Sequence, residues 1–146
     1  MKPVSVLAAA AATATLALGG CMTIPDSHPL AGTEWQLTAI DTSGSTTTLT
    51  PALQRRHTIA FADGGELQLQ LDCNRGRSTW TAGQPANGAG QISIGPIAGT
   101  RMACPAPSFG NDLAGLSDAE RFTTTLDGRQ LVIETPGLRY TFAAAE

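Results

Sequence analysis

Polar and apolar residues alternate strictly through residues 66–73, which read ELQLQLDC. The three leucines and the cysteine fall on one side of this segment, and the polar residues fall on the other. A period of two predicts a half-buried β-strand. Residues 57–62 alternate in the same way, and Asp63-Gly64-Gly65 supplies residues that tolerate positive φ, so the two segments are expected to form a hairpin.

The same alternation recurs along the rest of the chain and predicts about eight short strands. Ser/Thr/Gly-rich residues 41–50 and Gly-rich residues 83–90 have the composition of loops, and Asn74-Arg75-Gly76 has that of a turn. The strands are expected at residues 30–40, 57–62, 66–73, 78–82, 91–94, 122–126, 129–135 and 138–142.

One segment has helical spacing. Leu113, Leu116 and Ala119 recur within residues 111–122 as they would on one face of a helix. Signals for a helix start occur near both the beginning and the end of this segment, which predicts a short or broken helix. Many short strands, tight turns and one short helix together indicate a mainly β fold, a small antiparallel β-barrel-like domain.

The first twenty residues have the pattern of an export signal. The positive start Met1-Lys2 precedes the apolar run Val4–Leu18, which at 15 residues is shorter than the roughly 20 that a membrane-spanning helix needs. This pattern predicts a signal peptide over residues 1–20. The sequence Leu-Gly-Gly-Cys that ends it resembles the bacterial lipobox, so Cys21 is the expected lipid acceptor. An ordinary signal peptide with an incidental cysteine is the alternative.

A lipid on Cys21 would hold the chain to the membrane, because each buried CH₂ of an acyl chain contributes about 0.8 kcal/mol. Residues 21–29 contain two prolines and little to bury, so they are interpreted as a tether to the folded domain, residues 30–146. Met22, rather than Asp, follows the cysteine, which in a Gram-negative host favours the outer over the inner membrane. The expected location is the bacterial cell envelope, with the domain facing the periplasm.

The amino-acid composition limits the classes of partner that the protein is expected to bind. With 42% hydrophobic and 14% charged residues, the chain can build one core. Its only lysine is Lys2 and it has no basic run, which argues against nucleic acid as a partner. The only histidines, His28 and His57, stand apart from the cysteines, so no catalytic residue, metal ligand or cofactor is predicted.

Cys73 and Cys104 remain once Cys21 is assigned to the lipid. An even pair in an oxidising compartment favours a disulfide. Closing a loop of about 30 residues would stabilise the fold by roughly 3–4 kcal/mol on the chain-entropy estimate. Two unpaired buried thiols, or a reactive thiol, are the alternatives.

Two cysteine-containing motifs carry a family resemblance. Residues 72–76 read DCNRG and residues 95–105 read GPIAGTRMACP. In this order they resemble the signature of the META domain family, also called HslJ-like, of bacterial envelope proteins. Residues 30–37 and 127–133 are similar to that family's opening strand and closing hairpin, and the family often has Gly where Asp72 stands. The resemblance implies a small barrel-like domain, often a lipoprotein, with a link to envelope stress and no established catalytic residues.

Five residues lie close in sequence to one or other of the paired cysteines, so a disulfide would gather them. Mixed arginine and aromatic patches are common at binding surfaces. In the alternative interpretation, Arg101 pairs with Asp72 and Trp80 packs in the core. The candidate binding patch consists of Asn74, Arg75, Arg77, Trp80 and Arg101.

Together these patterns predict a non-enzymatic envelope lipoprotein that binds a protein or a small ligand near the membrane, in connection with envelope stress. An inhibitor or binding module for an exported enzyme is the alternative, because a small disulfide-closed barrel presents rigid loops.

Overall fold

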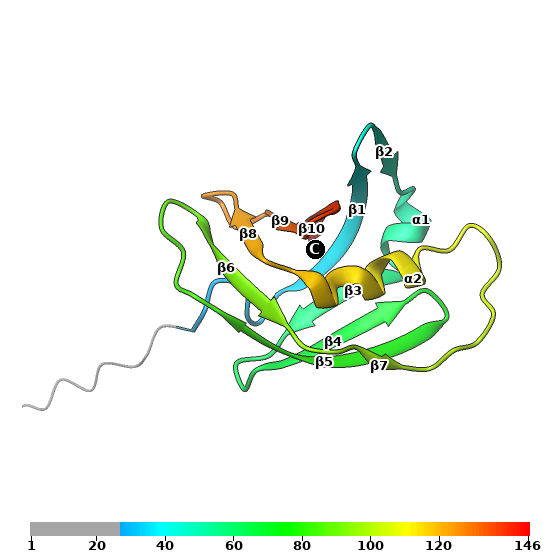
Figure 1. Cartoon of the computed structure of the whole chain (residues 1–146), viewed down its shortest axis with the longest axis horizontal. Helices are drawn as coiled ribbons and strands as arrows, with labels where there is room; N and C mark the ends of the chain where they lie inside the picture. The colour runs from blue at the N-terminus through cyan, green and yellow to red at the C-terminus, as the bar shows by residue number, and fades with distance from the viewer. Residues whose placement is uncertain (1–26) are drawn as a thin grey trace, which may run out of the picture.

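The fold is a closed antiparallel β-barrel (Figure 1). The computed structural model describes residues 27–146. The ring of strands runs β1-β3-β4-β5-β6-β8-β9-β10, and β10 pairs with β1 to close it. Two short strands pair outside this ring, β2 with β1 and β7 with β5. The strands are β1 (Glu34–Thr42), β2 (Ser45–Thr48), β3 (His57–Phe61), β4 (Glu66–Leu71), β5 (Asn74–Ala82), β6 (Ala89–Ile94), β7 (Ala98–Gly99), β8 (Arg121–Thr124), β9 (Gln130–Glu134) and β10 (Leu138–Ala144).

The core is the interior of this barrel, filled by the alternate side chains of the strands. On β1, Trp35 and Leu37 are buried as the alternation predicts, but the next buried residue is Ile40 rather than residue 39. The register against β10 shifts at this point, which marks a β-bulge. A bulge inserts one residue and so reverses which side chains face inward.

Short helices complete the structure. α1 (Pro51–Gln54) precedes β3, and α2 (Gly110–Leu113) continues into the 3-10 helix η1 (Ala114–Asp118). The predicted short or broken helix is therefore confirmed. It ends at residue 118 rather than 122 because the chain is already extended at Ala119, two residues before β8 begins. The helical segment packs against β4 and β6.

Two sequence-based expectations were wrong in detail. Residues 41–50, expected to be a loop, contain β2, whose four residues are exposed on both faces. Hydrophobic alternation cannot reveal a strand with no buried face. The expected turn at residues 74–76 is instead the start of β5, and the chain turns at Asp72 and Cys73.

The helical segment is held to the barrel by Tyr140 on β10. The Tyr140 hydroxyl donates a hydrogen bond of 2.7 Å to the carbonyl oxygen of Asp112. Gly115 packs directly over this hydroxyl, since a Cβ there would lie 2.6 Å from it. Leu113 and Leu116 are fully buried beside it. Burial, with smaller contributions from the Asp112 and Asp118 carboxylates, raises the pKa of Tyr140 to about 12.

This raised pKa predicts a loss of stability in alkali. Below pH 10 the tyrosine is protonated in both the folded and the unfolded chain. Between pH 10 and 12 the unfolded chain loses this proton first, so the free energy of unfolding should fall across that range. Tyr140 is the only tyrosine, and the only lysine is Lys2, so little else in the domain titrates there.

The test is the near-ultraviolet absorbance of tyrosinate, followed with pH, together with urea unfolding at the two ends of the range. Tyr140→Phe should lose most of the alkaline decline in stability. A tyrosinate signal that appears near pH 10 in the folded protein would contradict the buried hydrogen bond.

Candidate functional site

The candidate site begins at the tight turn between β4 and β5. Leu71 pairs with Asn74, so only Asp72 and Cys73 form the turn. Asp72 has φ 63°, in the left-handed region that glycine, asparagine and aspartate tolerate best. The side chain of Asp72 was expected on the outer face of a strand, whereas the residue is 2% exposed. The turn conformation redirects it inward.

Arg56 neutralises this buried carboxylate. Its Nη1 lies 3.0 Å from Asp72 Oδ1, and the Asp72 backbone N–H donates to the Arg56 carbonyl oxygen. Neither carboxylate oxygen accepts a hydrogen bond. The alternative pairing of Asp72 with Arg101 is therefore wrong. Sequence offered no signal for Arg56, which lies 16 positions before its partner.

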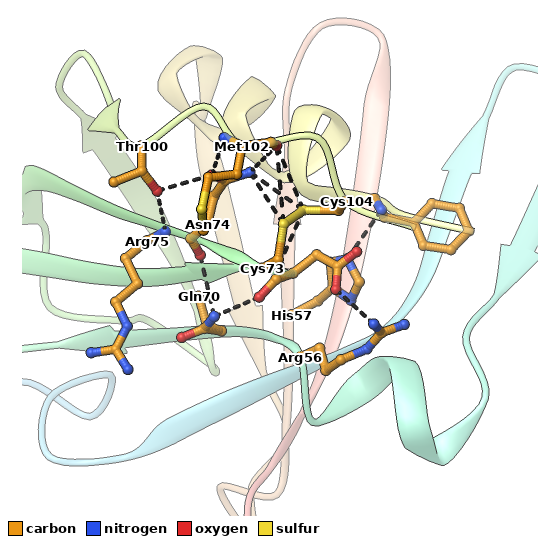
Figure 2. The surroundings of a disulfide bond; sticks show 11 residues. Arg56, His57, Gln70, Cys73, Asn74, Arg75, Thr100, Met102 and Cys104 are labelled. Atoms are coloured by element: carbon orange, nitrogen blue, oxygen red, sulfur yellow. Dashed lines mark hydrogen bonds and ion pairs between the residues drawn. A yellow bond between two sulfur atoms is a disulfide. The ribbon is translucent and has the colours of Figure 1, made fainter. Parts of the chain in front are cut away.

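Cys73 and Cys104 form a disulfide, as the sequence favoured (Figure 2). Cys73 lies in the turn and is half-buried, so the expectation that it lies inward on a strand was wrong. The bond ties the β4–β5 turn to the segment between β7 and α2.

Asn74 ties the same two segments a second time (Figure 2). Its Nδ2 donates to the Met102 carbonyl oxygen over 2.9 Å, and its Oδ1 accepts from the Met102 N–H over 2.6 Å. Thr100 Oγ1 also donates to this Oδ1 and accepts from the Arg75 N–H. The side-chain amide of Asn74 thus bonds to both the N–H and the carbonyl group of Met102, as the backbone of a neighbouring β-strand would. We call this set of bonds and the disulfide the clamp.

Two glycines allow the clamped segment to lie close to β5. Gly99 of β7 pairs with Gly76 of β5. A Cβ on Gly99 would lie 2.8 Å from the Arg75 carbonyl oxygen, and one on Gly76 would lie 3.0 Å from the Leu71 side chain. A larger residue at Gly99 would require the backbone to move, and one at Gly76 would require the Leu71 side chain to shift, so the glycines of the two motifs have a packing role.

Beside the clamp, the outer surface of the barrel carries two arginines. Arg75 and Arg77 are exposed on the outer face of β5, and the cross-strand neighbours on β4 are Gln70 and Gln68. The surface is hollowed, with a volume of about 630 Å³, and Thr58 is only 8% exposed in it. We call this surface the arginine face. It is lined by Glu34, Thr58, Ala60, Gln68, Leu69, Gln70, Arg75, Gly76, Arg77, Ala98, Gly99 and Thr100.

Not all residues of the predicted patch meet there. Asn74, Arg75 and Arg77 lie together on or beside the arginine face. Trp80 instead is 7% exposed and donates its indole N–H to the Ala62 carbonyl oxygen inside the barrel, so it cannot belong to a surface patch. Arg101 is exposed beside Met102 in a second hollow, of about 510 Å³, that also reaches the clamp.

Both histidines are engaged with backbone groups. His57 is fully buried, its Nδ1 donates to the Leu53 carbonyl oxygen, and its Nε2 accepts the Phe109 N–H. His28, assigned by sequence to the tether, packs against Trp80 and Phe122 and reaches the Gly83 carbonyl oxygen. Sequence reasoning missed the role of His57, although the residue falls in phase with the buried Ile59 and Phe61 of β3.

Within residues 27–146, no group of three or more His, Cys, Asp or Glu is placed to hold a metal ion. In the same part of the chain, no helix has the length and apolarity needed to cross a membrane. The predicted lipid acceptor Cys21 and the signal peptide lie outside the described residues.

Residues 28–146 match the family described as META domain. The chain belongs to the META domain family. The two motifs that resemble its signature are the two halves of the clamp. The position where the family often has Gly is Asp72, which has the positive φ that glycine adopts without strain.

Solved structures share this META domain fold. An NMR structure of a protein from Burkholderia xenovorans is 22% identical, with a TM-score of 0.62 and 98% of each chain covered. The crystal structure of a DUF4847 family protein from Bacteroides vulgatus is 13% identical, with a TM-score of 0.53, and covers 78% of this chain and 93% of that one. At these identities the likeness shows the fold alone. No curated protein matches the chain.

The buried ion pair between Arg56 and Asp72 predicts that replacing one partner costs more stability than replacing the other. Arg56→Ala leaves the Asp72 carboxylate buried without a counter-charge and should lower the free energy of unfolding by about 1–3 kcal/mol. Asp72→Gly removes the buried charge and suits the φ of 63°, so it should cost less. Urea unfolding of both variants measures the difference.

The matched control is Arg56→Ala in the Asp72→Gly background, where it should cost less than about 0.5 kcal/mol, as for an ordinary surface substitution. An equal cost in both backgrounds would mean that Arg56 stabilises the fold by packing rather than by its charge.

Proposed function

We propose that the protein is a non-enzymatic lipoprotein of the bacterial cell envelope that binds a partner through the arginine face. The observation that carries this proposal is the pair Arg75 and Arg77, exposed above a hollow and without a counter-charge. Within residues 27–146, no carboxylate lies within 4.0 Å of either guanidinium. Four other arginines, Arg56, Arg121, Arg129 and Arg139, each have such a carboxylate, whereas Arg55 and Arg101 have none among the described residues but do not line this hollow.

Unpaired arginines are notable because the chain is acidic, with a formal net charge of −3. Guanidinium groups are weakly hydrated and bind planar anions through two parallel hydrogen bonds, which makes arginine frequent at the centre of binding surfaces. The clamp holds the backbone beneath these two side chains, so little ordering would be needed when a partner binds.

The roles of the polar side chains support a non-enzymatic function. Each histidine has both ring nitrogens bonded to backbone groups, which leaves neither in place as a general base. The two domain cysteines are joined to each other and are not nucleophiles.

The inhibitor alternative has less support. The clamped segment is rigid and presents Met102, 60% exposed, as an inhibitory loop would. Inhibitors that bind like a substrate, however, offer the backbone groups of the exposed residue to the enzyme. The N–H and carbonyl of Met102 are both bonded to Asn74, so they are already occupied.

The first residues that the structure describes lie at the other end of β5 from the clamp. His28, seven residues after the proposed lipid acceptor Cys21, contacts Gly83 just beyond the end of β5. Gly83 is six residues from Arg77, or about 20 Å at the rise of a strand. His28 thus contacts the domain away from the arginine face, which supports a face that meets partners in the periplasm. Met22 favours the outer membrane in a Gram-negative host.

Photo-crosslinking in intact cells tests this function. A photoreactive residue at Gln68, in the centre of the arginine face, should give a discrete adduct. The adduct should be lost with Arg75→Gln/Arg77→Gln and should move from the membrane to the soluble fraction with Cys21→Ala. The matched control position is Thr46, exposed on β2 and outside the hollow.

Adducts of equal yield at Gln68 and Thr46, or adducts unaffected by the double arginine variant, would reject the arginine face as the binding surface. An adduct that stays with the membrane in Cys21→Ala would reject the lipid anchor.

A further inference from the structure

We propose that the ligand of the arginine face is an extended peptide segment of mixed charge, with acidic residues over β5 and a basic residue over β1. This inference rests on the proposed function and adds the chemical class of the partner. It follows from the position of charges, of small residues and of neutral polar groups across the hollow.

The acidic end is set by the arginines. Arg75 and Arg77 are alternate residues on one face of a strand, so their Cα atoms are about 6.6 Å apart. Two carboxylates on alternate residues of an extended chain lie on the same side of it and have a similar separation. Each guanidinium can then form a bidentate pair with one carboxylate.

The opposite end of the hollow is acidic. Glu34 on β1 pairs in register with Ala60, Ala60 with Gln68, and Gln68 with Arg77. Three strand spacings separate Glu34 from Arg77, which is about 14 Å, or about four residues of an extended peptide. Glu34 is exposed and, within residues 27–146, has no cation within 4.0 Å. A basic residue at that distance from the acidic end would complement it.

Between these ends, the surface suits a peptide backbone. Ala60 has a small side chain that allows close approach, and Ala98 and Gly99 of β7 border the other side of Arg77 and Gly76 on β5. The side-chain amide of Gln70 already donates to the carbonyl oxygens of Asp72 and Asn74, and that of Gln68 donates to Glu66. The oxygens of these two amides are acceptors that match the N–H groups of peptide bonds, and the Thr58 hydroxyl can donate or accept. A polymer of phosphates offers only acceptors and could not use the amide oxygens.

Charge also argues against a uniformly anionic ligand. Glu34 and Glu66 both lie on the outer face, on the far side of Gln68 from Arg75. They would repel a sulfated polysaccharide or an array of anionic lipid headgroups that extended beyond the two arginines. The charge order therefore favours a peptide in which the negative charge is confined to one end.

Fluorescence anisotropy with the full-length lipidated protein in neutral detergent tests this inference. The probe is a dye-labelled peptide with Asp-Ser-Asp at one end, Ser and Gly in the middle, and Lys about four residues later. It should bind, and Arg75→Gln/Arg77→Gln should weaken binding at least about tenfold, because two charge-assisted pairs are lost. Added salt should weaken binding as well.

Three controls sharpen the result. Arg55→Gln removes an exposed arginine that also has no carboxylate partner within residues 27–146 but lies outside the hollow, and it should leave affinity unchanged. A peptide with Asn-Ser-Asn in place of Asp-Ser-Asp should not bind. Glu34→Gln should weaken the lysine-containing peptide but not one in which Lys is replaced by Ser.

Two outcomes overturn the inference. Arginine-dependent binding of a sulfated polysaccharide or of anionic vesicles, without binding of the peptide, would leave the arginine face as a binding surface and reject its peptide ligand. Peptide binding that is equal in wild type and in the double arginine variant would reject the site assigned here. The proposed function is tested separately, because crosslinking in cells uses none of these probes.

Discussion

The clamp between the β4–β5 turn and the segment after β7 is the constraint on which the rest of the site depends. Residues 98–104 contribute only a two-residue strand to the sheet, which could not hold its place by ladder hydrogen bonds alone. The Cys73–Cys104 bond and three hydrogen bonds from the Asn74 side chain to Thr100 and Met102 hold this segment against β5. The segment held in this way forms one side of the hollow in the arginine face.

The barrel itself has other supports. β1 and β10 close the ring along most of their length, and the bulge after Leu37 places Ile40 in the core. The helical segment α2–η1 packs on the barrel through buried leucines and the Tyr140 hydroxyl. His57 joins the start of β3 to the residue before α2. Barrel and clamp are therefore separable parts, which is why the second can serve binding while the first supplies stability.

Sequence alone predicted the barrel because alternation is a local property that survives in nearly every strand. The sequence-based prediction missed β2, because both of its faces are exposed. It also placed the turn at Asn74, because the turn-like composition of residues 74–76 was given more weight than the alternation of inward and outward residues along the strand. Once the turn is placed at Asp72 and Cys73, the same alternation predicts that Arg75 and Arg77 face outward and that Trp80 faces inward, as observed.

Other contacts had no local signal. Asn74 bonds to residues 26 and 28 positions away, and Arg56 pairs with a carboxylate whose burial follows from a left-handed turn. The cysteine pair was predictable from the count of thiols and the compartment, since it needs no knowledge of the path of the chain. Membership of the META domain family was predictable from the two motifs. Only the structure showed that these motifs form the two halves of one clamp.

Hydrogen exchange of the full chain carrying Cys73→Ser and Cys104→Ser tests the central claim, that the clamp builds one side of the arginine face and leaves the barrel intact. The account predicts faster exchange in residues 98–104 and at the start of β5, with the protection of β1 and β10 unchanged. Unchanged exchange in residues 98–104, or an equal loss of protection in every strand, would contradict it.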